Sequence, residues 1–112
     1  ETSRDFCYIE NTVQANILAA LASDDKKNQI YNVAVGDRTT LNALFTNIKK
    51  ALKFRDVQVL SEPVYREFRA GDVRHSQASI EKIRKNLGYM PTHRIEAGIS
   101  EAVAWYVRGK GE

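Results

Sequence analysis

Apolar residues recur every three or four positions in four stretches of the chain, and this spacing predicts four helices. The first covers about residues 11–22, and Asn11 or Thr12 suits the position that caps its N-terminus. The second follows Thr39 or Thr40, which suit the same capping role. The apolar faces carry Val13, Ile17, Leu18 and Leu21 in the first helix, and Leu41, Leu44, Phe45, Ile48 and Leu52 in the second.

The other two predicted helices lie near the C-terminus. Residues 78–87 form a short helix that Gly88 ends, because glycine readily adopts the conformation that closes a helix. A longer helix runs from about Arg94 to Arg108 and is ended by Gly109. The apolar positions are Ile80, Ile83 and Leu87 in the short helix, and Ile95, Ile99, Ala102, Val103 and Tyr106 in the long one.

Four shorter stretches predict strands, at residues 6–9, 30–35, 57–60 and 64–68. The clearest is 30–35, whose nearly continuous apolar character is typical of a strand buried on both faces of a parallel sheet. Strands and helices therefore alternate along the chain. We expect an α/β fold, with a small, largely parallel sheet and flanking helices, formed by residues 1–112 as a single domain.

Composition and charge exclude several classes of protein. Of the 112 residues, 43% are hydrophobic and 28% are charged, which is typical of a globular domain. The net charge of +3 comes from scattered lysines and arginines without a long basic run, so we expect no nucleic-acid partner. No apolar run approaches the roughly 18 residues of a membrane span, so we expect no membrane partner and a cytoplasmic setting. The single cysteine, Cys7, forms no metal-binding pattern with the histidines.

Polar side chains gather in FRAGDVRHSQ, residues 68–77, at the end of a predicted strand. Ligands of open α/β sheets collect at strand ends, and the arginine fork matches phosphate oxygens. Arg69 there, and Arg4 beside another predicted strand, are therefore candidates to bind an anionic ligand, and Asp72 could accept hydrogen bonds from a ribose diol. A surface ion pair between Arg69 and Asp72 is the alternative.

No catalytic set is visible in the sequence. The two histidines, His75 and His93, are each expected to be structural or solvated. The glycines are too scattered to form a phosphate-binding loop of the dinucleotide type.

Five motifs in order point to a known family: RDFCYIEN, IYNVAVGDRTTL, FRAGDVRHSQAS, LGYMP and EAVAWYVRG. Their series and spacing resemble the C-terminal third of the UDP-N-acetylglucosamine 4-epimerases. These enzymes belong to the NAD-dependent epimerase/dehydratase family in the extended short-chain dehydrogenase/reductase superfamily. The resemblance covers nearly the whole chain and implies a substrate-binding portion that lacks the complete Rossmann domain.

The resemblance also implies roles for four residues. Arg4 and Arg69 would contact the diphosphate of a UDP-sugar, and Asp72 would accept hydrogen bonds from the uridine ribose. Ser76 would face the sugar, where a bulky residue restricts relatives to glucose and galactose forms. A serine leaves room for an acetamido group, which favours UDP-GlcNAc and UDP-GalNAc.

The same resemblance predicts what these 112 residues do not supply. The NAD-binding fold and the Ser/Thr-Tyr-Lys catalytic set lie in the other two-thirds of the family's enzymes. We therefore expect no catalytic or cofactor-binding residue in this chain, weak UDP-sugar binding and no epimerase activity. The alternative is a stand-alone nucleotide-sugar binding or protein-interaction module on the same scaffold. Without the NAD-binding domain, apolar surface would be uncovered, which predicts a homo-oligomer or association with that domain.

Overall fold

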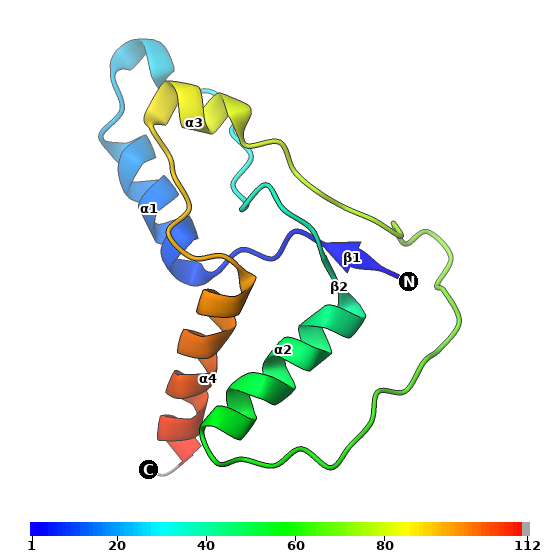
Figure 1. Ribbon diagram of the computed structural model, residues 1–112. Helices are drawn as coiled ribbons and strands as arrows, with labels where there is room; N and C mark the ends of the chain where they lie inside the picture. Colours follow the sequence, from blue (N-terminus) through cyan, green and yellow to red (C-terminus); the bar gives the residue numbers. More distant parts are fainter. Residues whose placement is uncertain (111–112) are drawn as a thin grey trace.

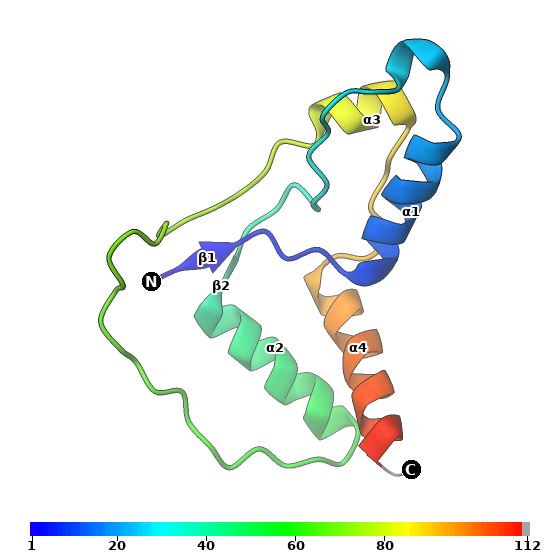
Figure 2. The ribbon, with the colours of Figure 1, turned by 180° about the vertical axis from the view of Figure 1, so that it is seen from behind.

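The computed structural model describes residues 1–110, and two short strands and four helices are its main elements. They follow the order β1 (Ser3–Arg4), α1 (Ile9–Ala20), the 3₁₀ turn η1 (Asp24–Lys26), β2 (Thr39–Thr40), α2 (Leu41–Phe54), α3 (Glu81–Leu87) and α4 (Ile95–Lys110). Helices α1 and α3 lie together at one end of the molecule, and α2 lies beside α4 at the other (Figures 1 and 2). Residues 55–80 run in a wide arc from the end of α2 back to α3 (Figure 1).

The four predicted helices are confirmed, and local signals set two of their ends. The Thr40 hydroxyl caps α2 by accepting a hydrogen bond from the Ala43 N–H at 3.0 Å. Gly88 ends α3 with a φ of 72°, in the left-handed region that glycine adopts without strain. Gly109 was predicted to end α4, but this helix continues through it to Lys110.

The predicted cap of the first helix is wrong. Helix α1 begins at Ile9 with Tyr8 as its N-cap, earlier than Asn11 or Thr12. The Asn11 side chain is fully buried and serves a different purpose: its Nδ2 donates to the His93 carbonyl at 2.7 Å, and its Oδ1 accepts from the Thr92 N–H at 2.9 Å. Asn11 therefore ties α1 to the turn before α4.

The predicted inward face of α1 is also largely wrong. The residues that α1 buries are Asn11 and Ala15, and of the predicted face Leu18 alone packs against the core, whereas Val13, Ile17 and Leu21 are exposed. Helix α3 packs against the side of α1 that carries Ala15, and Ile83 lies in the same small cluster. No element of the described chain covers the opposite, apolar side of α1.

The sheet differs from the prediction, although the α/β class is confirmed. It has two strands in antiparallel register, Ser3 opposite Thr40 and Arg4 opposite Thr39. One parallel bridge joins Ser3 to His75. The largely parallel sheet is therefore wrong, because among residues 1–110 no strand pairs in parallel with another.

The predicted strands at 6–9, 30–35, 57–60 and 64–68 do not form as strands. A strand needs a hydrogen-bonded neighbour, and these segments find none in the described part of the chain. In the segment 30–35, Ala34 and Val35 are buried, but Ile30 is 87% exposed. Ile9, the last of the residues predicted for the first strand, opens α1 instead.

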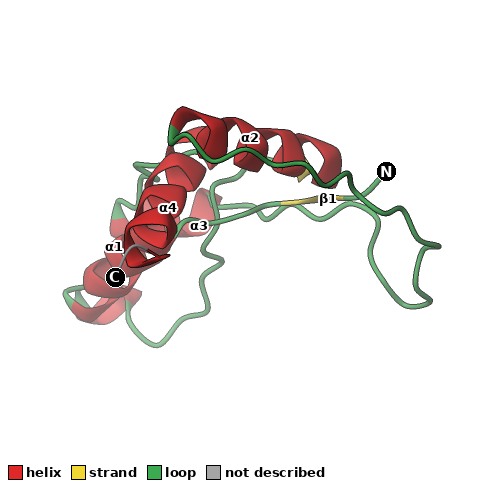
Figure 3. Ribbon diagram, turned by 90° about the horizontal axis from the view of Figure 1, so that it is seen from below, coloured by secondary structure: helices red, strands yellow, loops and turns green. Residues whose placement is uncertain are grey.

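The molecule is flat and extended rather than compact (Figure 3). Its extents are 52 × 39 × 19 Å and its radius of gyration is 16.8 Å, against about 13 Å for a compact domain of this length. Its accessible surface is 8449 Å², roughly 2,200 Å² more than a monomeric protein of its mass exposes. The buried apolar residues are Ala15, Ala34, Val35, Ile83, Tyr89 and Val103. No helix among the described residues is long and apolar enough to cross a membrane.

Tyr89 is the largest side chain of this small core and is fully buried. Its hydroxyl donates a hydrogen bond to the Ala34 carbonyl at 2.7 Å. Burial raises the pKa of the Tyr89 phenol well above its usual value, and the nearby Cys7 raises it further. Tyr89 therefore joins the loop after α3 to the segment that precedes β2.

Candidate functional site

Ser3 joins three segments that are far apart in the sequence. Its N–H donates to the Arg74 carbonyl at 2.9 Å, and its carbonyl accepts from the Ser76 N–H at 3.1 Å. Its buried hydroxyl lies 2.7 Å from Nδ1 of His75. Since Thr40 pairs with Ser3 on the other side, β1 lies between β2 and residues 74–76. His75 therefore contributes to the junction between β1 and residues 74–76.

An open cavity of about 690 Å³ lies beside this junction. Its walls come from the N-terminal residues, the start of α2 and the extended segment 63–74. Three of the four predicted site residues line it, namely Arg4, Arg69 and Asp72. The fold thus places side chains from segments far apart in the sequence around one space.

Arg4 is held in place by backbone oxygens. Its Nη1 donates to the Ser3 carbonyl at 2.8 Å and lies 3.3 Å from the Arg74 carbonyl. These contacts follow from the bridge between β1 and residues 74–76, which brings the Arg74 carbonyl within reach. The guanidinium is therefore oriented by the fold before any ligand is present.

Arg69 and Asp72 form the surface ion pair that was the alternative to a ligand site. Nε of Arg69 lies 2.9 Å from Oδ2 of Asp72, and the Arg69 side chain is 85% exposed. Gly71 lies between them with a φ of 86°, and the Asp72 N–H donates to the Arg69 carbonyl at 3.2 Å, so the backbone turns sharply here. The ion pair uses Nε alone, and the two terminal nitrogens of the guanidinium lie outside it.

Two further arginines of the cavity were missed by sequence reasoning. Arg66 lines it from the extended segment, and so does Arg74, whose guanidinium stacks over the Phe68 ring at 4.7 Å from the centroid. Four arginines therefore face three carboxylates, those of Glu1, Glu67 and Asp72. The signal was present as the clustering of arginines between residues 66 and 74.

Ser76 does not line the cavity. Its side chain is exposed, and its N–H donates to the Ser3 carbonyl, two residues after Arg74 on the wall. The segment that carries these residues is also fixed to α2, because the Tyr65 hydroxyl donates to Oδ1 of Asn42 at 2.8 Å. Ser76 thus lies beside the cavity, on the strand-like stretch that borders β1.

A second polar cluster lies outside the cavity, where His93 faces Glu101. Nε2 of His93 is 3.0 Å from Oε1 of Glu101, and this hydrogen bond lowers the pKa of the Glu101 carboxyl. The His93 ring also contacts the Tyr8 ring, with 4.9 Å between centroids. Burial raises the pKa of Tyr8, and its hydrogen bond to Glu101 raises it further. His93 is therefore held between Tyr8, the N-cap of α1, and Glu101 of α4.

Comparison with known proteins gives several relatives. No family model matches the chain. A protein described as a UDP-glucose 4-epimerase of Methanocaldococcus jannaschii is 33% identical over 103 residues, which are 92% of this chain and 30% of that protein.

Two solved structures share both sequence and fold with the chain. The UDP-glucose 4-epimerase of Thermotoga maritima with UDP-glucose is 33% identical with a TM-score of 0.83, over 98% of this chain and 33% of its own. The UDP-N-acetylglucosamine 4-epimerase of Methanobrevibacter ruminantium, in complex with UDP-N-acetylmuramic acid, is 34% identical with a TM-score of 0.78, over 97% of this chain and 33% of its own. The chain spans about a third of the length of each of these relatives.

Proposed function

We propose that this chain, whose homologues and structural neighbours include UDP-sugar 4-epimerases of the NAD-dependent epimerase/dehydratase family, forms the substrate-binding portion of such an enzyme. The family resemblance drawn from the five motifs is confirmed by these matches, and the chain corresponds to the C-terminal portion of the epimerase structures.

The observation that carries the proposal is the shared cavity of Arg4, Arg69 and Asp72. Its volume of about 690 Å³ falls within the range of roughly 300–1,000 Å³ that small-molecule sites occupy. Two arginines that line one cavity from separate segments suit a diphosphate, because guanidinium groups bind phosphate oxygens with short, charge-assisted hydrogen bonds. In this proposal the diphosphate draws Arg69 away from Asp72, and the freed carboxylate accepts hydrogen bonds from the ribose.

Ser76 supports a choice between the two kinds of sugar that the relatives bind, with and without an acetamido group. Relatives of nearly equal identity are named for UDP-glucose and for UDP-N-acetylglucosamine, so overall identity favours neither sugar. A serine at position 76 leaves volume for an acetamido group, and its place next to the cavity wall is consistent with contact to the sugar. We therefore favour acetamido sugars.

The chemical step would depend on groups that this sequence does not carry. NAD, which the family uses to oxidise C4 of the sugar, would be held by the NAD-binding portion of the enzyme. The scattered glycines of this chain offer no dinucleotide loop. The contribution of Arg4, Arg69 and Asp72 would be to fix the nucleotide end, so that the sugar projects toward the cofactor.

Calorimetric titration with UDP-GlcNAc, UDP-glucose, UDP and UMP tests the binding proposal. Binding by these 112 residues alone should be weak, because contacts that the NAD-binding portion of an epimerase would supply are missing while the cost of immobilising the ligand remains. UDP should bind more tightly than UMP, since UMP lacks the second phosphate. Arg69→Ala and Arg4→Ala should each weaken UDP binding by roughly 10- to 100-fold, the worth of a charged hydrogen bond.

Arg108→Ala is the matched control, because Arg108 is exposed on α4 and lies outside the cavity. This variant should bind UDP as the parent chain does. Equal affinity for UDP and UMP, or unchanged UDP affinity in Arg69→Ala, would contradict the proposed binding of the diphosphate by these arginines.

A second proposal concerns association, and the extended shape of the molecule supports it. The excess exposed surface of roughly 2,200 Å² is the area that large, permanent interfaces bury. Exposed apolar side chains lie on α1, at Ile17 and Leu21, and on the extended segment, at Leu60 and Val64. We propose that the NAD-binding portion of an epimerase covers this surface, and that a second copy of the chain does so in its absence.

Sedimentation equilibrium at micromolar concentration, with and without a co-expressed NAD-binding portion, tests this proposal. A dimer or larger assembly is expected for the chain alone, and a one-to-one complex with the added portion. Ile17→Glu with Leu21→Glu should weaken the assembly. The proposal would be contradicted if the chain stays monomeric at every concentration and does not bind the NAD-binding portion.

A further inference from the structure

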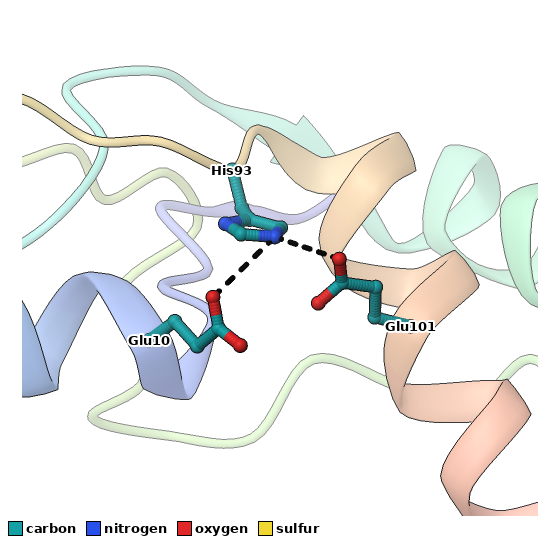
Figure 4. Close-up of side chains that lie close together, drawn as sticks. All are labelled: Glu10, His93 and Glu101. Atoms are coloured by element: carbon teal, nitrogen blue, oxygen red, sulfur yellow. Dashed lines mark ion pairs between the residues drawn. The ribbon is translucent and has the colours of Figure 1, made fainter.

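Three side chains from distant parts of the sequence converge between α1 and α4. Glu10 lies in the first turn of α1, Glu101 lies in α4, and His93 lies in the turn before α4 (Figure 4). Nε2 of His93 is 3.0 Å from Oε1 of Glu101 and 3.7 Å from Oε2 of Glu10. One ligand atom from each residue lies within 4.8 Å of the other two. Two carboxylates and an imidazole thus share one small volume.

The imidazole is fixed at its other nitrogen. Nδ1 of His93 lies 2.8 Å from the Thr92 hydroxyl, and that hydroxyl lies 3.3 Å from Oδ1 of the buried Asn11. The Thr92 hydroxyl can therefore accept a hydrogen bond from Nδ1–H while it donates its own hydrogen to Asn11. In that tautomer the lone pair of Nε2 faces the carboxylates of Glu101 and Glu10 and can bind a cation that lies between them, whereas without a cation Nε2–H donates to Glu101.

We propose that Glu10, His93 and Glu101 bind a divalent cation of the zinc class. Imidazole nitrogen and carboxylate oxygen are both ligands of Zn²⁺, with bonds of about 2.0–2.2 Å that place neighbouring ligand atoms roughly 3.3–3.5 Å apart in a tetrahedron. The observed separations of 3.0 and 3.7 Å lie on either side of this value. A water molecule would complete the tetrahedron from the solvent side.

The exposure of each ligand fits this role. The His93 side chain is only 13% exposed and is held by Thr92, whereas those of Glu10 and Glu101 are 59% and 51% exposed and can rotate onto the ion. A hydrogen bond from the second nitrogen of a metal-binding histidine is a usual feature of such sites, because it fixes the tautomer and the ring plane. Here that bond leads through Thr92 to Asn11, inside the core.

The ion would act on the fold and not on the nucleotide-sugar cavity. None of the three ligands lines that cavity, and they join α1 to α4 at a point where Asn11 already links α1 to residues 92 and 93. A cation there would fix the angle between the two helices. The spacing of cysteines and histidines in the sequence gave no hint of it, because two of the ligands are glutamates 91 positions apart.

Titration of ZnCl₂ into the metal-stripped 112-residue chain tests the proposal by calorimetry, with Co²⁺ absorption as a second measurement. One ion per chain should bind, with the visible spectrum of four-coordinate Co²⁺. Glu10→Gln and Glu101→Gln should each weaken binding at least tenfold. Thr92→Val, which keeps the shape but removes the hydroxyl, should weaken it by roughly 10- to 100-fold.

Two controls separate this site from general binding to the surface. Glu96→Gln removes an exposed carboxylate of the same helix α4 and should leave the affinity unchanged. Cys7→Ser removes the one thiol of the chain and should also bind Zn²⁺ normally. The proposal is overturned if the chain binds no zinc, if Glu96→Gln weakens binding as much as Glu101→Gln, or if Cys7→Ser abolishes it.

Discussion

The carboxylate of Asp5 holds the backbone at Gly36. Its Oδ2 accepts a hydrogen bond from the Gly36 N–H at 2.9 Å, and its Oδ1 accepts one from the Val35 N–H at 3.0 Å. Asp5 is the residue after Arg4, so the same pair of hydrogen bonds fixes the chain at the end of β1 and beside the candidate cavity.

Asp5→Ala should lower the free energy of unfolding by about 1.5–3 kcal/mol, because two backbone N–H groups lose a charged acceptor. Urea denaturation followed by circular dichroism measures this. Asp24→Asn is the control, since the Asp24 carboxylate is fully exposed and forms only a 3.5 Å surface pair with Lys27. Equal stability of the Asp5→Ala variant and the control would mean that the Asp5 bonds contribute nothing.

Gly98 and Gly109 of α4 should respond to alanine in opposite directions. A Cβ at Gly98 would lie 2.9 Å from Cβ of Tyr8, a contact that forces the backbone apart, and overpacking of this kind costs about 1–3 kcal/mol. A Cβ at Gly109 meets no atom within 4 Å, so Gly109→Ala should be neutral or stabilise by up to about 1 kcal/mol. Thermal unfolding of the two variants gives the comparison, and a stabilised Gly98→Ala would show that α4 can move away from Tyr8.

Tyr89 should make the protein sensitive to alkaline pH. Its pKa is raised in the folded state, so above about pH 10 the unfolded chain loses the phenolic proton first and stability falls as the pH rises. Below that pH the contribution of Tyr89 is fully present. Tyr89→Phe should cost about 1–3 kcal/mol at pH 7, because the Ala34 carbonyl loses its donor.

The same substitution should flatten the decline of stability between pH 10 and 11. A single site contributes up to about 1.4 kcal/mol per pH unit to this slope. Denaturation of both proteins across pH 7–11 measures the difference. Identical slopes would mean that Tyr89 ionises without unfolding the chain.

Ser76→Tyr should change the choice of sugar without changing the grip on the nucleotide. If Ser76 faces the sugar, a tyrosine ring fills the volume that an acetamido group needs, so UDP-GlcNAc should lose roughly tenfold or more in affinity relative to UDP-glucose. Binding of UDP itself should persist. Ser79→Tyr, at a nearby exposed position outside the cavity, is the control. Equal loss for all three ligands would place Ser76 in the fold rather than in sugar recognition.

The purified chain should not interconvert UDP-GlcNAc and UDP-GalNAc, with or without added NAD. This expectation rests on the sequence, which carries neither a dinucleotide loop nor a catalytic base in a recognised arrangement. Chromatography of the two sugars after long incubation at high protein concentration measures it. Any turnover that scales with the amount of chain would contradict the assignment of these residues to substrate binding alone.

Sequence reasoning located the helices because their signals are local. Thr40 caps α2 through its own neighbour Ala43, and Gly88 ends α3 through its own φ angle, so each signal acts within a few residues. The strand at residues 30–35 failed for the opposite reason. Its apolar pattern is typical of a strand that lies between two other strands. Residues 1–110 form no strands beside it, so it stays irregular. The apolar side of α1 failed in the same way, because the exposure of Ile17 depends on what packs against the helix.

The candidate site was predictable where a motif names its residues. Arg4, Arg69 and Asp72 were selected before the structure brought them to one cavity, although their ligand roles stay predictions. Arg66 and Arg74 could not be predicted as cavity residues, because the spacing of residues along an extended segment does not show which side chains face the cavity. The contact of His93 with Glu10 could not be predicted from the sequence either, because it depends on how the turn before α4 packs against α1.

The position of Ser3 between Thr40 and His75 has a consequence for the order of folding. The Ser3–His75 contact closes a loop across 72 positions of the sequence. Closing such a loop costs chain entropy before the contact itself contributes any stability. Contacts of this range form slowly, whereas α2 and α3 form from local signals. The junction at Ser3 should therefore form after α2 and α3, which need no distant partner. Its amide protons should exchange with deuterium sooner than those of the Ile83 and Tyr89 core.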